Sequence, residues 1–122
     1  MWKLRSPKRS IRALAPLPLF ILAGCRSAFV IATVQNRTPQ PIQLIEVDYP
    51  SASFGTQSLA PGADFHYRFK VLGEGRMKLI YTDTTHQEKT FEGPLLKEGA
   101  EGALTITIVP NDVQWQNGTR IH

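Results

Sequence analysis

The sequence has little of the chemistry from which metal sites are built. Its 122 residues include a single cysteine, Cys25, so no disulfide bond can form within the chain. The three histidines, His66, His86 and His122, show no pair at the spacing of metal ligands, and no second cysteine could complete a zinc site. We therefore expect neither a disulfide nor a metal ion or other cofactor.

Catalytic motifs are also missing. None of the serines after residue 24 lies in a Gly-x-Ser-x-Gly turn or a Ser-x-x-Lys pair. Asp83 and Glu88 flank an expected turn, and Gly73-Glu74-Gly75 is followed by no helix that could complete a phosphate loop. We predict that the protein is not an enzyme, with an envelope hydrolase whose site is assembled only by folding as the alternative. Those serines are Ser27, Ser51, Ser53 and Ser58.

Positive charge is scarce once the first residues are set aside. The chain has 14 Lys and Arg against 10 Asp and Glu, but five of the cations precede residue 13, where there is no acidic residue. The remainder is close to neutral, whereas a nucleic-acid-binding domain needs a basic stripe to neutralise phosphates. We expect no nucleic-acid partner. The five early cations are Lys3, Arg5, Lys8, Arg9 and Arg12.

The first 24 residues have the layout of an export signal. A basic segment, 1–12, precedes an apolar segment, 13–24, that contains no charged side chain. A helix needs about 20 apolar residues to cross a bilayer, so this segment is too short. The alternative, a membrane span over 13–34, would place Arg26 in the bilayer at a cost of about 2.5–3.5 kcal/mol.

Leu22-Ala23-Gly24-Cys25, at the end of the apolar segment, resembles the lipobox of bacterial lipoproteins at all four positions. The resemblance implies that the Cys25 thiol receives a diacylglyceryl group and that a signal peptidase cuts between Gly24 and Cys25. The domains would then be a signal peptide, 1–24, and a lipid-anchored body, 25–122. Arg26 and Ser27 are not the Asp that retains some lipoproteins at the inner membrane, so the outer membrane is favoured if the organism has one. Ordinary cleavage near an unmodified Cys25 is the alternative.

The body shows strand-like alternation and no sustained helical periodicity. Phe65, Tyr67 and Phe69 alternate with polar residues, and 104–108 repeats the pattern. A break in phase at Leu44-Ile45 predicts a bulge, and Gly93-Pro94 favours an edge strand. Residues 51–55 are interpreted as a turn and strand entry, and 117–122 as a frayed end. The expected strands are 29–35, 42–49, 65–71, 77–82, 90–96, 104–108 and 113–116.

These short strands and connections predict an all-β fold, a single antiparallel β-sandwich of about seven or eight strands. In general shape the body resembles the small immunoglobulin-like or transthyretin-like modules of envelope proteins, and the fold-class prediction is immunoglobulin-like. The cysteine and tryptophan landmarks of antibody domains are missing. The resemblance is architectural and implies no specific activity.

Two surface features could bind a partner. Trp115, with Tyr49 or Phe54, could form a recognition patch, although large aromatic side chains more often fill a core. The row His66, Arg68 and Lys70 could face anionic head groups or could simply protect a strand edge. The leading hypothesis is an envelope lipoprotein held to the membrane through Cys25, a non-enzymatic binding or structural module with an envelope protein as partner. The alternative is a carbohydrate- or small-ligand-binding module at the cell surface that uses Trp115.

Asn36-Arg37-Thr38 and Asn117-Gly118-Thr119 match the N-glycosylation pattern. Because the lipobox indicates a bacterium, we interpret both matches as accidental.

Overall fold

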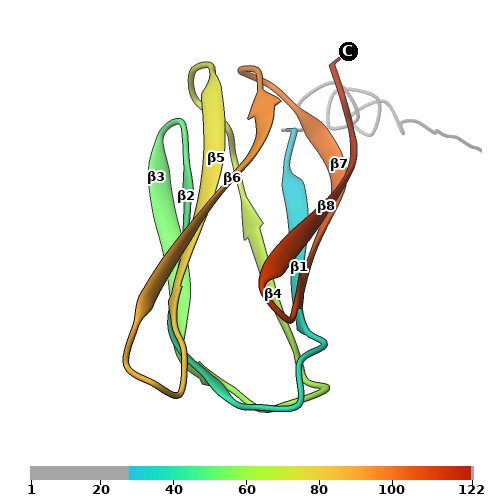
Figure 1. The fold of residues 1–122 in the computed structure, drawn as a ribbon. Helices are drawn as coiled ribbons and strands as arrows, with labels where there is room; N and C mark the ends of the chain where they lie inside the picture. Colours follow the sequence, from blue (N-terminus) through green and yellow to red (C-terminus); the bar gives the residue numbers. More distant parts are fainter. Residues whose placement is uncertain (1–27, 122) are drawn as a thin grey trace, which may run out of the picture.

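The computed structural model describes residues 28–121, which form eight strands (Figure 1). No helix within these residues is long and apolar enough to cross a bilayer. The alternative membrane span over 13–34 is contradicted at residues 30–34, which belong to the first strand. The strands are β1 (Val30–Asn36), β2 (Ile42–Tyr49), β3 (Ala52–Leu59), β4 (Asp64–Phe69), β5 (Gly75–Thr82), β6 (Glu88–Leu96), β7 (Glu101–Val109) and β8 (Asp112–Arg120).

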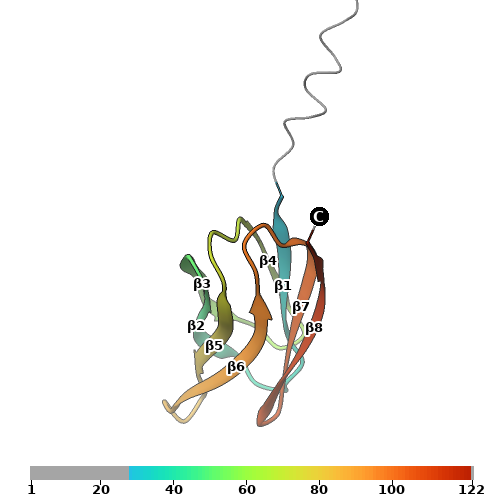
Figure 2. The same ribbon diagram turned by 90° about the horizontal axis from the view of Figure 1, so that it is seen from above.

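The strands form two four-stranded sheets, one in the order β4-β1-β7-β8 and the other in the order β3-β2-β5-β6. Seen from above, the two sheets lie as separate layers (Figure 2). The prediction of an all-β fold with seven or eight strands is confirmed. The prediction of a purely antiparallel arrangement is wrong at one pair, because β1 and β7 run parallel. The connection 97–100 leads from β6 in one sheet to β7 in the other, and β7 therefore starts at the same end of the molecule as β1.

The strand order also differs from the expected immunoglobulin-like arrangement. In an immunoglobulin domain the first two strands belong to the same sheet. Here β1 and β2 belong to different sheets, and the connection 37–41 joins one layer to the other. Within each sheet the hairpins β2–β3, β5–β6 and β7–β8 supply the local antiparallel pairs.

The two ends of this sandwich are named here by their distance from the start of β1. The proximal end contains the start of β1, the end of β8 and the connections 50–51, 70–74 and 97–100; it lies uppermost in Figure 1. The distal end contains the connections 37–41, 60–63, 83–87 and 110–111. The chain therefore enters and leaves at the proximal end, and Val30 is paired with Gly102 there.

The core lies between the sheets and takes alternate residues from each strand. Val30, Ala32 and Val34 of β1 are fully buried, and Leu104, Ile106 and Ile108 of parallel β7 lie beside them. From the opposite sheet come, among others, Val47, Met77, Leu79 and Tyr81. This alternation explains why β1, β5 and β7 are recognisable in the sequence.

The predicted bulge in β2 is confirmed. The β2–β5 register shifts between Gln43 and Glu46, and Leu44 has a φ of 50°. A Cβ added to Gly55, on the neighbouring strand β3, would lie 2.0 Å from the Ile45 carbonyl oxygen, so only glycine fits beside the bulge.

The predicted edge position of Gly93-Pro94 is also confirmed. β6 is the outer strand of its sheet, and its register with β5 shifts between Arg76 and Lys78. The interpretation of residues 51–55 as a turn and strand entry is confirmed, because Ser51 lies in a turn and β3 begins at Ala52, although the strand runs on to Leu59. One interpretation is wrong: residues 117–120, expected to be frayed, complete β8 by pairing with β7.

Candidate functional site

The predicted lipid-attachment and cleavage residues, Cys25 and Gly24, lie outside the described residues. Near the start of the described residues, Phe29 is bound to the sandwich. Its carbonyl oxygen accepts a hydrogen bond from the Gly102 amide at 3.1 Å, and the Arg68 guanidinium lies over its ring at 4.5 Å. The chain is thus fixed to the fold four residues after Cys25.

The predicted aromatic patch is not a single surface. Tyr49 and Phe54 lie together, with ring centroids 6.1 Å apart, but Phe54 is only 7% exposed. Trp115 lies on β8, which is the edge strand opposite to β4 in their sheet. It packs on β6, where a Cβ added to Gly93 would lie 2.7 Å from the indole ring.

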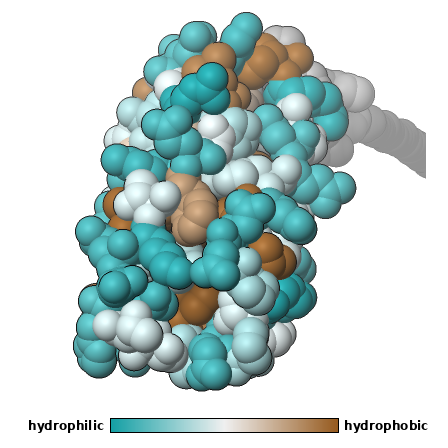
Figure 3. Space-filling model, viewed as in Figure 1, coloured by the Kyte–Doolittle hydropathy of each residue, from teal (hydrophilic) through white to brown (hydrophobic). Residues whose placement is uncertain are grey.

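Each of these aromatic groups closes one open side of the sandwich. Phe54 on β3 stacks with Tyr67 on β4 at 4.4 Å and lies 5.6 Å from Phe69, so it joins the edge strands of the two sheets. Tyr49 packs on Phe69 at 4.1 Å. Trp115 bridges β8 and β6 on the other side. The hydrophobic atoms that surface over β6 and β8 in Figure 3 mark this side. The patch residues therefore act as packing between sheets.

The residues considered for catalysis or metal binding are not brought together. His66 Nδ1 lies 3.1 Å from the Thr33 hydroxyl on the outer face of its sheet, and His86 is in the distal connection 83–87. Ser51 is at the proximal end, where its hydroxyl donates to the Lys70 carbonyl and accepts from the Leu72 amide. Within residues 28–121 no group of three His, Cys, Asp or Glu side chains could hold a metal ion.

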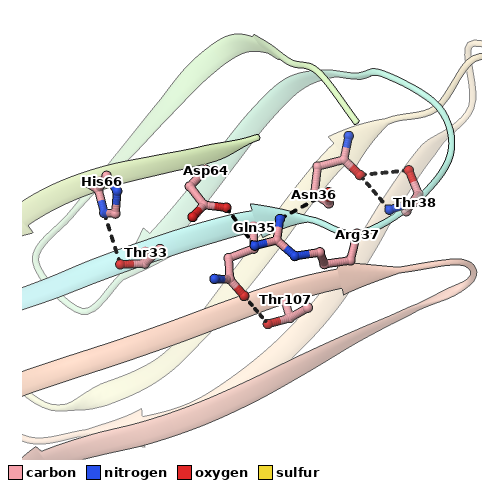
Figure 4. A network of polar contacts seen from close by, with 8 residues as sticks. All are labelled: Thr33, Gln35, Asn36, Arg37, Thr38, Asp64, His66 and Thr107. Carbon is pink, nitrogen blue, oxygen red and sulfur yellow. Dashed lines mark hydrogen bonds and ion pairs between the residues drawn. The ribbon is translucent and has the colours of Figure 1, made fainter. Parts of the chain in front are cut away.

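In the described part of the chain, 28–121, one polar side chain, Asn36, is completely buried. Its amide nitrogen donates to the carbonyls of Gln40 at 2.9 Å and Leu59 at 3.0 Å, and its Oδ1 accepts from the amide and hydroxyl of Thr38 at 3.0 and 2.7 Å. Figure 4 shows Asn36 and Thr38 beside the Arg37–Asp64 ion pair, whose atoms lie 3.0 Å apart. Asn36 thus joins the distal connection 37–41 to the end of β3. A buried amide engaged at both atoms is no glycan acceptor in the folded protein.

Next to this network is the distal pocket, a hollow of about 230 Å³. The connection 37–41 forms one wall, and the turns that follow β5 and β7 form the others. Its surface is mainly apolar because three prolines, Ile42 and the ring of Tyr81 line it. Burial, followed by the charge of Asp83, raises the pKa of Tyr81, so its phenol is uncharged at neutral pH. The lining is Thr38, Pro39, Gln40, Pro41, Ile42, Tyr81, Asp83, Thr84, Lys89, Pro110 and Asn111.

A fixed pair of charges forms the polar rim of the distal pocket. Asp83 Oδ1 accepts hydrogen bonds from the Thr85 hydroxyl at 2.6 Å and from the amides of Thr85 and Gln87 at 2.8 and 3.0 Å. These bonds, led by the Thr85 hydroxyl, lower the pKa of Asp83 to about 2. Lys89 Nζ lies 3.6 Å from Asp83 Oδ2 and donates to Asn111 at 3.3 Å. The rim therefore offers a cation and a carboxylate held in place beside an apolar floor.

Sequence reasoning missed this pocket. Its residues come from three connections that are far apart in the chain, and only Pro39, Pro41 and Pro110, which punctuate those connections, could have marked them.

Comparisons with known proteins give one informative match. No protein family model matches the chain, and no curated protein matches it. An NMR structure of a protein from Eubacterium rectale is similar in fold, with a TM-score of 0.57 and 14% sequence identity. The match covers 75% of this chain and 90% of the other. At that identity the likeness shows the fold alone.

Proposed function

We propose that this chain is a lipid-anchored envelope protein whose sandwich binds a partner protein at its distal end. The observation that carries the proposal is the placement of two features at opposite ends of the sandwich. The chain leaves toward Cys25 from the proximal end, and the distal pocket lies at the other end. A lipid on Cys25 would therefore hold the pocket facing away from the membrane.

The short tether supports this orientation. Four residue steps lead from Cys25 to Phe29, which is fixed to β7 and to Arg68. Even a fully extended chain spans at most about 3.6 Å per residue, so the anchor lies within roughly 14 Å of the proximal end. Such a tether keeps the sandwich next to the bilayer surface, with the proximal end toward the membrane.

The dimensions of the distal pocket favour a protein partner over a free small ligand. Pockets for drug-sized ligands have volumes of about 300–1,000 Å³, and this one has about 230 Å³. It fits one apolar side chain, while Asp83 and Lys89 at the rim can pair with charges around that side chain. An inserted anchor residue with a polar rim is typical of protein interfaces.

We also propose that the body is a transthyretin-like module of the kind that the sequence resembles. Of the two module types that the sequence resembles, the immunoglobulin type has its first two strands in one sheet. Here these strands lie in different sheets, which supports the other type. Nothing in the arrangement of residues 28–121 favours a carbohydrate site at Trp115, because its indole packs on Gly93.

Mass spectrometry of the protein purified from its native membranes tests the anchor. We expect a chain that begins at Cys25 and carries the added mass of two or three acyl chains. In a Cys25→Ser variant the leader should stay uncut. An unmodified thiol, or a mature chain that begins elsewhere, would refute the anchor.

Site-specific photo-crosslinking in living cells tests the distal surface. A crosslinking residue at Thr84, in the pocket wall, should capture one defined envelope protein. The matched position is Gln116, which is also exposed but lies along β8 away from the pocket. Equal capture from both positions, or a product that persists when Lys89→Glu reverses the rim charge, would contradict binding at the pocket.

A further inference from the structure

The connections at the proximal end form a rigid surface. The Ser51 hydroxyl accepts from the Leu72 amide at 3.2 Å, which ties connection 50–51 to connection 70–74. The Gly99 amide donates to the Val71 carbonyl at 3.1 Å, which ties connection 70–74 to connection 97–100. The loops at this end of the two sheets are therefore fixed to one another.

This fixed surface exposes large apolar side chains. Leu72 is 58% exposed, Ile121 is 52% exposed and Leu95 is 44% exposed. Leu95 and Ile121 line the same shallow hollow at the ends of β6 and β8. Hydrophobic residues gather at this upper end in Figure 3. Because hydrogen bonds hold the backbone at Leu72, its side chain projects from an ordered loop, and such patches commonly mark interaction sites.

Cations are also concentrated at the proximal end. In residues 28–121 eight cations face ten acids, yet the proximal end, counted to two residues from its connections, carries five of the cations and four of the acids. The distal end, counted in the same way, carries two cations and four acids. The proximal cations are Arg68, Lys70, Arg76, Lys97 and Arg120, and the acids there are Asp48, Glu74, Glu98 and Glu101. The distal charges are Arg37, Lys89, Asp64, Asp83, Glu88 and Asp112.

We propose that the proximal end docks on an anionic phospholipid surface, with Leu72, Leu95 and Ile121 in the head-group region and Lys70 and Lys97 beside lipid phosphates. Lys97 lines the same hollow as Leu95 and Ile121, so a cation and apolar groups meet there, as an interfacial site requires. The acidic distal end is repelled by the same surface, which adds to the orientation.

The short tether between Cys25 and Phe29 favours a bilayer as the partner of the proximal end. This inference rests on the proposed lipid at Cys25. With roughly 14 Å of chain at most between the anchor and Phe29, the proximal end is held at the membrane. A separate protein would have to enter the narrow space between the sandwich and the lipid head groups to reach Leu72.

The experiment uses the full lipidated protein, reconstituted into vesicles of phosphatidylcholine with or without phosphatidylglycerol. Because Cys25 is the only cysteine and its sulfur is consumed by the lipid, a polarity-sensitive thiol dye reports only an introduced cysteine. The proximal variants are Leu72→Cys and Ile121→Cys. The matched distal control is Gln87→Cys, which is exposed in connection 83–87.

In anionic vesicles we expect the dyes at 72 and 121 to be shifted to the blue and protected from aqueous iodide, and the dye at 87 to behave as in water. Lys97→Gln should lower the ratio of docked to undocked protein roughly fivefold, the usual contribution of one cation near an anionic surface. Lys78→Gln, which removes a cation from the middle of β5, should leave the ratio unchanged.

Three outcomes overturn the inference. Equal iodide quenching at 72 and 87 on lipidated, vesicle-bound protein refutes docking and leaves the anchor intact. Equal protection at 72 with and without phosphatidylglycerol refutes the role of anionic lipid. A free thiol at Cys25 by mass spectrometry refutes the anchor and removes the premise of docking with it.

Discussion

Replacement of Asn36 by alanine is expected to be among the most damaging single polar substitutions in the sandwich. Its side chain is fully buried and makes four hydrogen bonds that join connection 37–41 to the end of β3. Of the groups that would lose Asn36, the Leu59 carbonyl lies at a buried contact, whereas those of Thr38 and Gln40 are only partly buried. The Leu59 carbonyl therefore stays desolvated without a partner in the folded state, and the other groups regain part of their hydration.

The magnitude follows from those bonds. Each contributes about 0.5–1.5 kcal/mol net, and buried partners left unsatisfied cost more. Part is retained, because the single Thr38 hydroxyl proton can then be donated to the Gln40 carbonyl, 2.9 Å away, instead of to Asn36. We expect Asn36→Ala to lower the free energy of unfolding by about 3 kcal/mol. For a domain of this size that corresponds to a fall in Tm of roughly 12–24 °C.

The chain contains its own control. Asn117 accepts hydrogen bonds from the Thr119 amide and hydroxyl at 3.0 and 2.6 Å, which repeats the local geometry of Asn36 and Thr38 in an exposed position. Asn117→Ala should cost only about 0.5 kcal/mol, because water replaces the lost partner. Both variants can be compared by urea denaturation of a chain that starts at residue 25 with Cys25→Ser, followed by Trp115 fluorescence.

An equal and small change in the urea midpoint for both substitutions would show that burial adds nothing to the contribution of Asn36. Asn36→Asp distinguishes the bonds that Asn36 accepts from those that it donates. The variant keeps Oδ1 as the acceptor for Thr38 and loses the two bonds donated to Gln40 and Leu59. A variant as stable as the parent at neutral pH would show that the bonds to Gln40 and Leu59 contribute little.

Three further predictions concern other parts of the sandwich. In the folded protein the pKa of Asp83 is lowered to about 2 from 3.8. The ionised carboxylate therefore stabilises the fold above pH 4, and this contribution is lost as the pH falls toward 2. In thermal scans, Asp83→Asn should lower Tm at pH 7 and match the parent near pH 2. Gly55→Ala should lower the free energy of unfolding by roughly 1–3 kcal/mol in denaturant titrations, because the added Cβ meets the Ile45 carbonyl. Gly75→Ala, whose Cβ would lie an ordinary 3.5 Å from Pro50, should be nearly neutral, and equal losses in the two variants would contradict the clash. Gly93→Ala should displace the indole, which we expect to see as a red shift of Trp115 emission with a similar loss of stability; an unchanged spectrum would argue against the packing of Trp115 on β6.

Strands that bury alternate residues were the predictable part of the fold. The bounds of β2 match the prediction at both ends, and the break at Leu44-Ile45 correctly marked the bulge. Only the entry of β3 was expected and its full length was not, because Phe54 and Leu59 alone among its residues are buried, and they are five positions apart, out of phase for a simple strand. Hydrogen bonds to β2 hold these residues as a strand, and the pattern of their side chains does not indicate that pairing.

The end of β8 and the parallel pair were hidden for another reason. Residues 117–120 are polar and include Gly118, so they resemble a loop, but β7 offers a paired partner along their whole length. The β1–β7 pair joins segments about 70 residues apart, as in Val30 with Gly102, and no local pattern encodes such a contact. The distal pocket depends on the same long-range arrangement. Cys25, by contrast, is a purely local signal in the sequence.

The position of β1 has a mechanical consequence for an anchored protein. β1, the strand nearest the predicted anchor, lies inside its sheet, with β4 on one side and β7 on the other. With the proposed lipid on Cys25 and a partner at the distal end, a pull between the two would act along the axis of β1, while its ladder hydrogen bonds point sideways to both neighbours. Those bonds would be loaded in shear and would fail together rather than one by one. A protein anchored in that way would carry tension through the sandwich without first losing β1.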